Sequence, residues 1–240
     1  MNSQPLPTAN TLPIINLTDV QFQWPNNPQP TLDIEALTVM SQEHLFIKGP
    51  SGCGKSTLLS LLTGINTATQ GHVQLLGQDL AQLKPRQRDK FRADNIGYIF
   101  QQFNLLPYLS VIDNVILPCQ FSAQRRANVS GELSQRATQL LTQLKLSESL
   151  LNKPVTELSI GQQQRVAAAR ALIGEPALLI ADEPTSALDY DNRSAFIELL
   201  LNEANRVGTT LVFVSHDPTL EKLFERSVYL PSLNKIRGTA

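Results

Sequence analysis

A run of consecutive residues around position 50 has the types and spacing that bind phosphate. Its glycines let the backbone wrap closely around phosphate oxygens, so that N–H groups and a helix N-terminus point at the anion. Lys55 adds a positive charge near the terminal phosphates, Ser56 offers a hydroxyl to Mg²⁺, and Thr57 continues the nucleotide-binding segment. The alternative, an ordinary glycine-rich turn before a helix, does not account for a match at every position of G-x-x-x-x-G-K-[ST]. The matching residues are Gly49, Pro50, Ser51, Gly52, Cys53, Gly54, Lys55 and Ser56.

Two neighbouring carboxylates form a second candidate element. Asp182 and Glu183 follow the apolar run 177–181, and the carboxyl ends of strands are where open α/β sheets bind ligands. Asp182 is suited to hold Mg²⁺ through its water shell, and Glu183 can polarise an attacking water. An Asp-Glu pair alone is more often a turn or a helix cap. The phosphate-binding run upstream favours the catalytic interpretation.

Alternating strands and helices are needed to position these groups. Period-two alternation at Val20, Phe22 and Trp24 predicts a strand in the N-terminal part, and a helical lobe is expected between 103 and 166. An apolar stripe marks one helix of that lobe, at Leu133, Ala137, Leu140, Leu141 and Leu144. Continuous apolar strands predict a parallel sheet covered on both faces. The remaining expected strands are 45–47, 72–76, 96–100, 177–181 and 210–214, and the expected core helices are 56–63 and 195–207.

Composition restricts the protein classes that fit. With 240 residues, of which 42% are hydrophobic, the chain can bury one substantial core with a small lobe, so a second copy of the site must come from another chain. A formal net charge of -1 gives no broad field for nucleic acid, and no nucleic-acid partner is expected. Cys53 and Cys119 lack metal-ligand spacing. We expect a flexible tail at 1–13, no signal peptide and no membrane-spanning run.

Three further segments resemble motifs of the ATP-binding cassette (ABC) proteins. They resemble the family's signature motif, its Walker B strand running into the D-loop, and its switch histidine. The order and spacing also fit, and the resemblance covers nearly the whole chain. The segments are Leu158-Ser159-Ile160-Gly161-Gln162-Gln163-Gln164-Arg165, Ala181-Asp182-Glu183-Pro184-Thr185-Ser186-Ala187-Leu188-Asp189 and Val214-Ser215-His216-Asp217.

This resemblance implies a fold and a division of the chain. The fold class is α/β, with a P-loop (RecA-like) core, an N-terminal antiparallel β subdomain and an inserted helical subdomain. The expected core comprises about 14–102 and 167–240, and the helical signature subdomain comprises about 103–166. All of these belong to a single ATPase domain spanning 1–240.

The resemblance also implies roles for individual residues. The signature helix of one chain faces the phosphate loop of its dimer partner, so Ser159, Gly161 and Gln162 contact the partner's nucleotide. Gln101 resembles the Q-loop glutamine that approaches Mg²⁺ and the attacking water, and His216 resembles the γ-phosphate contact. Two further implied nucleotide contacts have simple structural alternatives. They are Trp24, which stacks on adenine or is merely packed at a strand end, and Asp189, which lies at the dimer interface or caps a helix.

The function implied is that of an ATPase which energises transport by a separate integral-membrane permease, at the cytoplasmic face of the cell membrane. Its cofactors are ATP and Mg²⁺. The segment Phe100–Pro107, with Asp113-Asn114-Val115 and Leu117-Pro118, resembles the branch of lipoprotein-releasing and macrolide-exporting ATPases. Two alternatives are a soluble cassette ATPase acting on DNA or ribosomes and a small-molecule phosphotransferase. A phosphotransferase should carry an acceptor pocket and lid in place of the signature motif.

One position departs from the family pattern. The signature more commonly reads Leu-Ser-Gly-Gly-Gln, and Ile160 stands where the first glycine would be. Its β-branched side chain needs space and restricts φ and ψ, although its backbone N–H remains a donor. We therefore expect turnover to persist with altered dimer closure. Steady-state ATPase assays of Ile160→Gly test this, and a variant with the ATP dependence and rate of the wild type would contradict it.

Overall fold

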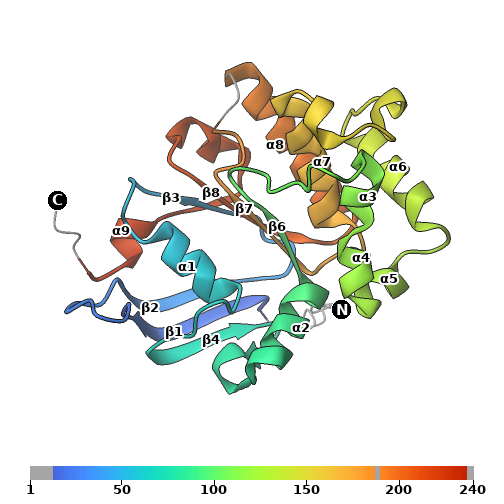
Figure 1. Cartoon of the computed structure of the whole chain (residues 1–240). Coiled ribbons are helices and arrows are strands. Elements are labelled where there is room, and N and C mark those ends of the chain that lie inside the picture. Colours follow the sequence, from blue (N-terminus) through green and yellow to red (C-terminus); the bar gives the residue numbers. More distant parts are fainter. Residues whose placement is uncertain (1–12, 187–189, 237–240) are drawn as a thin grey trace, which may run out of the picture.

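The computed structural model describes residues 13–186 and 190–236. Two sheets and the helices around them form the architecture (Figure 1). The first sheet is antiparallel, in the order β2-β1-β4-β5, and the second is parallel, in the order β6-β7-β8-β3-β9. The antiparallel strands are β1 (Ile15–Phe22), β2 (Leu32–Val39), β4 (Gln70–Leu75) and β5 (Gln78–Asp79). The parallel strands are β6 (Ile96–Ile99), β7 (Leu178–Asp182), β8 (Thr210–Ser215), β3 (Leu45–Lys48) and β9 (Arg226–Tyr229).

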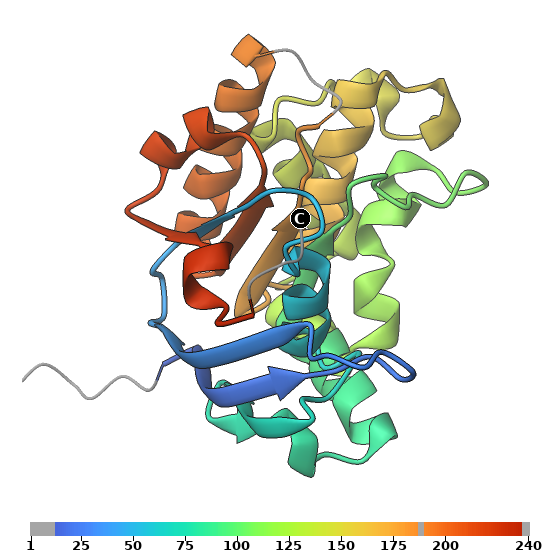
Figure 2. The same cartoon turned by 90° about the vertical axis from the view of Figure 1, so that its left-hand side faces the viewer.

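The parallel sheet is buried because its central strands are apolar on both faces. Successive side chains of a strand point to opposite faces, so Phe46 joins the core on one side of β3 while Leu45 and Ile47 join the core on the other. One core lies between the sheets and includes residues of α1 (Lys55–Leu62). Figure 2 shows this arrangement, with the blue antiparallel strands at the base of the molecule and α1 in cyan above them. The expected α/β fold is confirmed.

The second core joins the other face of the sheet to the helices on that side. The expected apolar stripe is confirmed: Ala137, Leu140, Leu141 and Leu144 are buried, and Leu133 is partly buried against the same core. The expected boundary at 166 falls inside one continuous helix, α7, so the division of the chain there stays a prediction. The helices on this side are α3 (Val111–Ile116), α4 (Pro118–Phe121), α5 (Ala123–Asn128), α6 (Leu133–Gln143), α7 (Ile160–Leu172) and α8 (Tyr190–Arg206). No helix in the described ranges is both long and apolar enough to cross a bilayer.

Several elements lie outside the expectations from sequence. Helix α2 (Pro85–Asn95) has almost no apolar stripe, and Asp94 is its buried residue. Strand β2 follows a turn-rich segment and was not among the expected strands. Elements β5, β9 and α9 (Leu230–Leu233) are too short to give a strong periodic signal. Helix α8 begins at Tyr190, earlier than the expected 195. Strand β1 ends at Phe22, so Trp24 lies in the turn that follows and not in the strand.

Helix α7 approaches β6 so closely that a glycine is required between them. A Cβ atom built on Gly97 would lie 2.2 Å from the carbonyl oxygen of Ala171, which is a backbone atom near the end of α7. Because a backbone oxygen cannot rotate away, the helix and the strand would have to separate. Gly97 therefore sets the distance between α7 and the strand that leads to Gln101.

We predict that Gly97→Ala lowers the free energy of unfolding by about 2–3 kcal/mol, because it overpacks a backbone contact. Denaturant unfolding followed by circular dichroism measures this change. Gly131→Ala is the matched control: its φ of 79° disfavours alanine, but no atom lies within 4 Å of the added carbon. This control should cost only about 1 kcal/mol. Equal destabilisation of the two variants would contradict the packing argument.

Candidate functional site

The phosphate-binding run forms a loop between the end of β3 and the start of α1. Gly54 caps α1 with φ 101°, and Gly52 has φ 79°, so both adopt left-handed conformations that suit glycine. A Cβ atom on Gly54 would also lie 2.8 Å from Cδ2 of Leu32. The free N–H groups of the first turn of α1 point out of the helix end, where they favour an anion.

A cavity of about 360 Å³ lies beside this loop and brings together half of the expected site residues. Three separate segments contribute to it: the loop with the start of α1, the turn after β6, and the end of β7. Thr31, just before β2, also lines the cavity and was missed, because a lone threonine in a polar turn carries no motif. The lining residues are Thr31, Ser51, Gly52, Gly54, Lys55, Ser56, Thr57, Gln101, Asp182 and Glu183.

Lys55 is buried at the base of this cavity. Its Nζ donates hydrogen bonds to the carbonyl oxygens of Gly49, at 2.8 Å, and Pro50, at 3.0 Å. The same ammonium lies 3.6 Å from Oε1 of Glu183. The loop and the carboxylate thus hold a positive charge in place beside the N-terminus of α1, where two sources of positive potential meet.

Glu183 occupies the point where β7 ends. Its backbone N–H donates to the carbonyl of Val214 on β8, at 2.9 Å, and its φ of 46° then turns the chain away from the sheet. The side chain lies between two basic residues: Oε1 faces Lys55, and Oε2 lies 2.9 Å from Nδ1 of His216. His216 follows β8, so the parallel pairing of β7 with β8 brings these two residues together.

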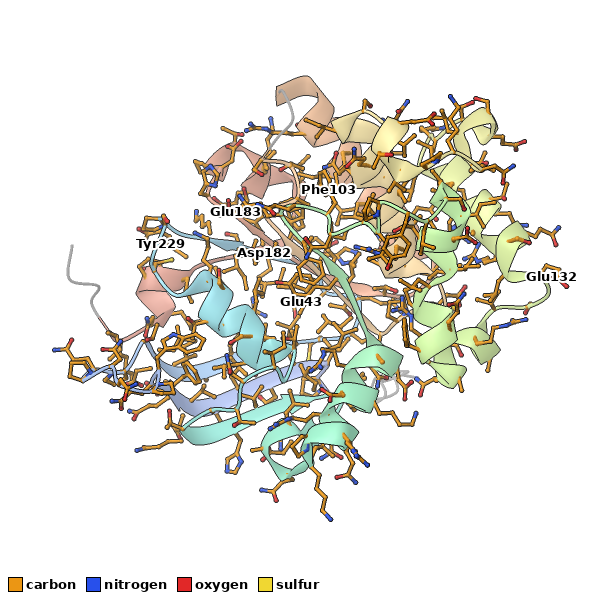
Figure 3. All side chains as sticks on the ribbon, viewed as in Figure 1. Glu43, Phe103, Glu132, Asp182, Glu183 and Tyr229 are labelled. Carbon is orange, nitrogen blue, oxygen red and sulfur yellow. The ribbon has the colours of Figure 1, made fainter. Side chains whose placement is uncertain are left out.

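Asp182 directly precedes Glu183, and both side chains are labelled in Figure 3. Burial raises the pKa of its carboxyl group, and the neighbouring Glu183 charge raises that pKa further. Tyr98 and Lys55 oppose this effect; the Tyr98 hydroxyl donates to Oδ2 of Asp182 at 3.3 Å. Tyr98 was missed from sequence because it is 84 positions away from Asp182, and only the pairing of β6 with β7 makes them neighbours.

Gln101 lies in the turn after β6 and reaches the cavity. This turn closes with a hydrogen bond from the N–H of Phe103 to the carbonyl of Phe100, at 2.9 Å. Phe103 itself is buried in the core on the helical side, so the turn is anchored at its second half. Gln101 therefore projects from a fixed turn between β6 and the helical side of the molecule.

Three of the expected loop residues do not line the main cavity. The Sγ of Cys53 lies where it would be 2.6 Å from a Cβ on Gly49, so this thiol fills space behind the loop. Gly49 and Pro50 instead line a second, more apolar cavity of about 570 Å³, together with His216 and Tyr229. Trp24 is 41% exposed and meets Phe22 edge-on, with ring centroids 4.9 Å apart; it lines neither cavity.

The expected signature residues begin α7. Ser159 caps the helix through a reciprocal pair of hydrogen bonds, in which its hydroxyl accepts from the N–H of Gln162 and its own N–H donates to Oε1 of Gln162. Ile160 is 53% exposed and Gly161 follows it at the helix start. None of these four residues at the start of α7 lines the main cavity, which is formed by other described parts of the chain. Asp189 lies outside the described residues.

Comparisons with known proteins agree in pointing to one family. A family model described as "ABC transporter" matches residues 32–186. The lipoprotein-releasing system ATP-binding protein LolD of Psychrobacter arcticus is 41% identical, over 81% of this chain and 84% of that protein. The macrolide export ATP-binding/permease protein MacB of Syntrophobacter fumaroxidans is 38% identical over 90% of this chain, which spans 30% of that longer protein.

A solved structure supports the same relationship. The ATP-binding cassette MJ0796 of Methanocaldococcus jannaschii, in a dimeric post-hydrolysis state bound to ADP and Pi, superimposes with a TM-score of 0.79. Its sequence is 36% identical in that superposition, which covers 90% of this chain and 93% of the other.

We predict that Tyr98→Phe raises the pKa of Asp182 further above its ordinary value. The Tyr98 hydroxyl stabilises the ionised carboxylate, so its removal favours the protonated form. Carboxyl ¹³C NMR titration measures the midpoint, and Asp182→Asn identifies the resonance. Tyr108→Phe, at an exposed tyrosine, is the control and should leave the midpoint unchanged. An unchanged midpoint in Tyr98→Phe would show that this hydroxyl has no influence on Asp182.

Proposed function

The chain belongs to the ABC transporter family, and from this membership we propose that it binds ATP and hydrolyses it to drive transport through a separate membrane permease. The observation that carries this conclusion is the convergence of a phosphate-binding loop, two strand-end carboxylates and a glutamine on one cavity. Family members of this kind are ATP-binding components of transporters, and MJ0796 has been observed with ADP and Pi. The chain is therefore an ATPase.

We assign the phosphates to the N-terminus of α1. The left-handed Gly52 and Gly54 leave backbone N–H groups available to phosphate oxygens, and Lys55 adds its charge. Trp24 is proposed to contact the adenine ring, because it is exposed and has a face for stacking. The hydroxyl-rich start of α1, at Ser56 and Thr57, completes this phosphate site.

The cavity also suits Mg²⁺. Ser56, Asp182 and Gln101 present a hydroxyl, a carboxylate and an amide, which supply the oxygen ligands that this cation prefers. Burial of Asp182 disfavours its charge, and a cation beside it would compensate. When bound, Mg²⁺ supplies positive charge to the phosphate oxygens.

Glu183 is proposed to accept the proton of the attacking water. Its carboxylate lies at the cavity and is oriented from two sides, by Lys55 and by Nδ1 of His216. This contact fixes the imidazole ring, whose other nitrogen, Nε2, we assign to the γ-phosphate. Because Glu183 and His216 are in contact, the position of the proposed base depends on the residue that we assign to the γ-phosphate.

A complete site needs a second copy of the signature helix. Ser159 and Gly161 form a second helix N-terminus suited to an anion, and they do not line the cavity of their own chain. The dimeric MJ0796 structures are the model for bringing this helix end to the nucleotide of a partner cassette. We propose that Ser159, Gly161 and Gln162 act in this way, and that Asp189 contributes at the interface.

The transporter assignment follows from the relatives reported above. LolD is named as the ATP-binding protein of a lipoprotein-releasing system, and MacB is named as both an ATP-binding protein and a permease. We propose that this chain docks on a separate permease at the cytoplasmic face of the membrane, within the same branch. The relatives give no support to a soluble ATPase that acts on DNA or ribosomes.

We predict that Glu183→Gln retains ATP binding and lowers the rate of hydrolysis by about 10²–10⁴-fold, because the amide cannot accept the proton. Binding is measured by equilibrium titration and turnover by phosphate release. Glu35→Gln is the matched control, since Glu35 pairs with Lys235 on the surface, away from the cavity. Wild-type hydrolysis by Glu183→Gln would refute the assignment of the base.

The same variant tests the transport assignment. Tagged Glu183→Gln protein, held in ATP, should recover an integral-membrane protein in stoichiometric amount from detergent-solubilised native membranes. Mass spectrometry identifies that protein, and its topology tests the proposed branch. If the tagged protein is folded and binds ATP but recovers only soluble partners, coupling to a permease would be contradicted.

A further inference from the structure

Helix α7 connects two distant functional regions of the chain. Its first turn carries Ser159 and Gly161, which we assigned to the nucleotide of the partner chain. Its last turn packs against β6, where Gly97 permits the close approach to Ala171. Thirteen residues of regular helix separate these ends, which corresponds to about 20 Å of rigid rod.

Near its C-terminal end, α7 contacts the turn that carries Gln101. The guanidinium of Arg170 donates two hydrogen bonds to this turn: Nη1 to the carbonyl of Asn104, at 2.7 Å, and Nη2 to the carbonyl of Phe103. Arg170 is partly buried, and this burial lowers the pKa of its guanidinium from the ordinary value. The planar fork of arginine suits a pair of neighbouring acceptors, which a lysine ammonium cannot match in the same geometry.

The turn itself needs support from outside. Phe103 and Asn104 both have positive φ values, of 60° and 48°, although neither is glycine. Two successive residues in this conformation are disfavoured and persist only where the surroundings hold them. Arg170 binds the carbonyls of these same two residues, so it stabilises the conformation that the backbone alone disfavours. Gln101 precedes them in the same turn.

The same helix also contacts the segment that follows Glu183. Gln164, which is fully buried on α7, donates its Nε2 to the carbonyl of Pro184 at 2.9 Å. Pro184 directly follows Glu183 in the chain. Helix α7 therefore donates hydrogen bonds to the backbone near Glu183 and near Gln101, the two residues that we assigned to the attacking water.

We propose that Arg170 is a positioning residue for hydrolysis: by fixing the turn at Phe103 and Asn104, it holds Gln101 in place and links it to the signature end of α7. Nucleotide bound by the partner at that end thereby influences Gln101 in the chain's own site. This inference rests on the role proposed above for Gln101. Arg170 itself touches neither nucleotide nor water in this mechanism.

Arg170→Lys is the variant that tests the proposal, because it keeps the charge and the aliphatic stem and removes the two-nitrogen fork. We expect the full-length chain to retain its affinity for ATP within about twofold and to lose about tenfold in kcat, since the loss falls on positioning and not on binding. Arg165→Lys is the matched control. Arg165 lies on the same helix and donates Nη1 to two carbonyls, of Leu144 and Lys145, that are far from the Gln101 turn in the chain.

A double-mutant cycle with Gln101→Ala distinguishes positioning from general stability. If Arg170 acts through Gln101, Arg170→Lys should lower kcat little further once Gln101 is alanine. The Arg165→Lys and Gln101→Ala pair should be additive, whatever turnover Arg165→Lys retains by itself. Equal losses from Arg170→Lys in both backgrounds would overturn the proposal.

Amide hydrogen exchange provides a readout that does not depend on catalysis. Arg170→Lys should raise exchange at residues 101–104 by about tenfold or more while β8 stays protected, because only the turn is released. Exchange that rises equally at β8 would mean a general loss of stability and would overturn the proposal. If Gln101→Ala alone keeps full turnover, the proposed role of Gln101 fails, and exchange at 101–104 still decides whether Arg170 holds the turn.

Discussion

The geometry of the site depends on one main-chain hydrogen bond, from the N–H of Glu183 to the carbonyl of Val214. This bond extends the ladder between β7 and β8 by one residue beyond Asp182, and the chain then turns away with a positive φ at Glu183. The proposed base is therefore placed by the sheet before any side chain contributes. His216 follows Val214 by two residues, so the same pairing delivers the imidazole to the carboxylate. Parallel strands make this possible because their carboxyl ends meet at one edge.

The charges at this edge support one another. Lys55 would be costly to bury alone, and Glu183 beside Asp182 would bring two negative charges close together. In the structure, Lys55 lies between loop carbonyls and Glu183, His216 takes the second oxygen of Glu183, and the Tyr98 hydroxyl stabilises the charge of Asp182. The raised pKa of Asp182 is the remaining imbalance, and it falls on the residue that we assign to a divalent cation.

Sequence reasoning succeeded where the information is local. The phosphate loop is continuous in the chain, and its required glycines at 52 and 54 explain both the pattern and the geometry. The strand carrying Asp182 was also recognisable from its apolar run. In contrast, the contacts of Tyr98 with Asp182 and of Arg170 with Phe103 join residues 84 and 67 positions apart, and no periodicity announces them. Helix α2 escaped prediction for a different reason: it lacks an apolar stripe, and its side-chain contacts include the hydrogen bond from the Lys84 N–H to Gln87 at its start and the ion pairs Asp89–Arg92 and Lys90–Asp94 within the helix.

A rigid helix between two sites also explains how a dimer of identical chains can coordinate them. Each copy of α7 has one end proposed for the partner's nucleotide and two internal contacts, through Gln164 and Arg170, beside its own Glu183 and Gln101. A helix of this length does not compress, so a displacement at Ser159 must appear at the other end or be absorbed where the helix meets its neighbours. At that end, Gly97 lets the backbone of α7 pack directly against β6, with no side chain between them. Under the proposed roles of these residues, movement caused by nucleotide at one site is directed towards the turn that carries Gln101 in the other.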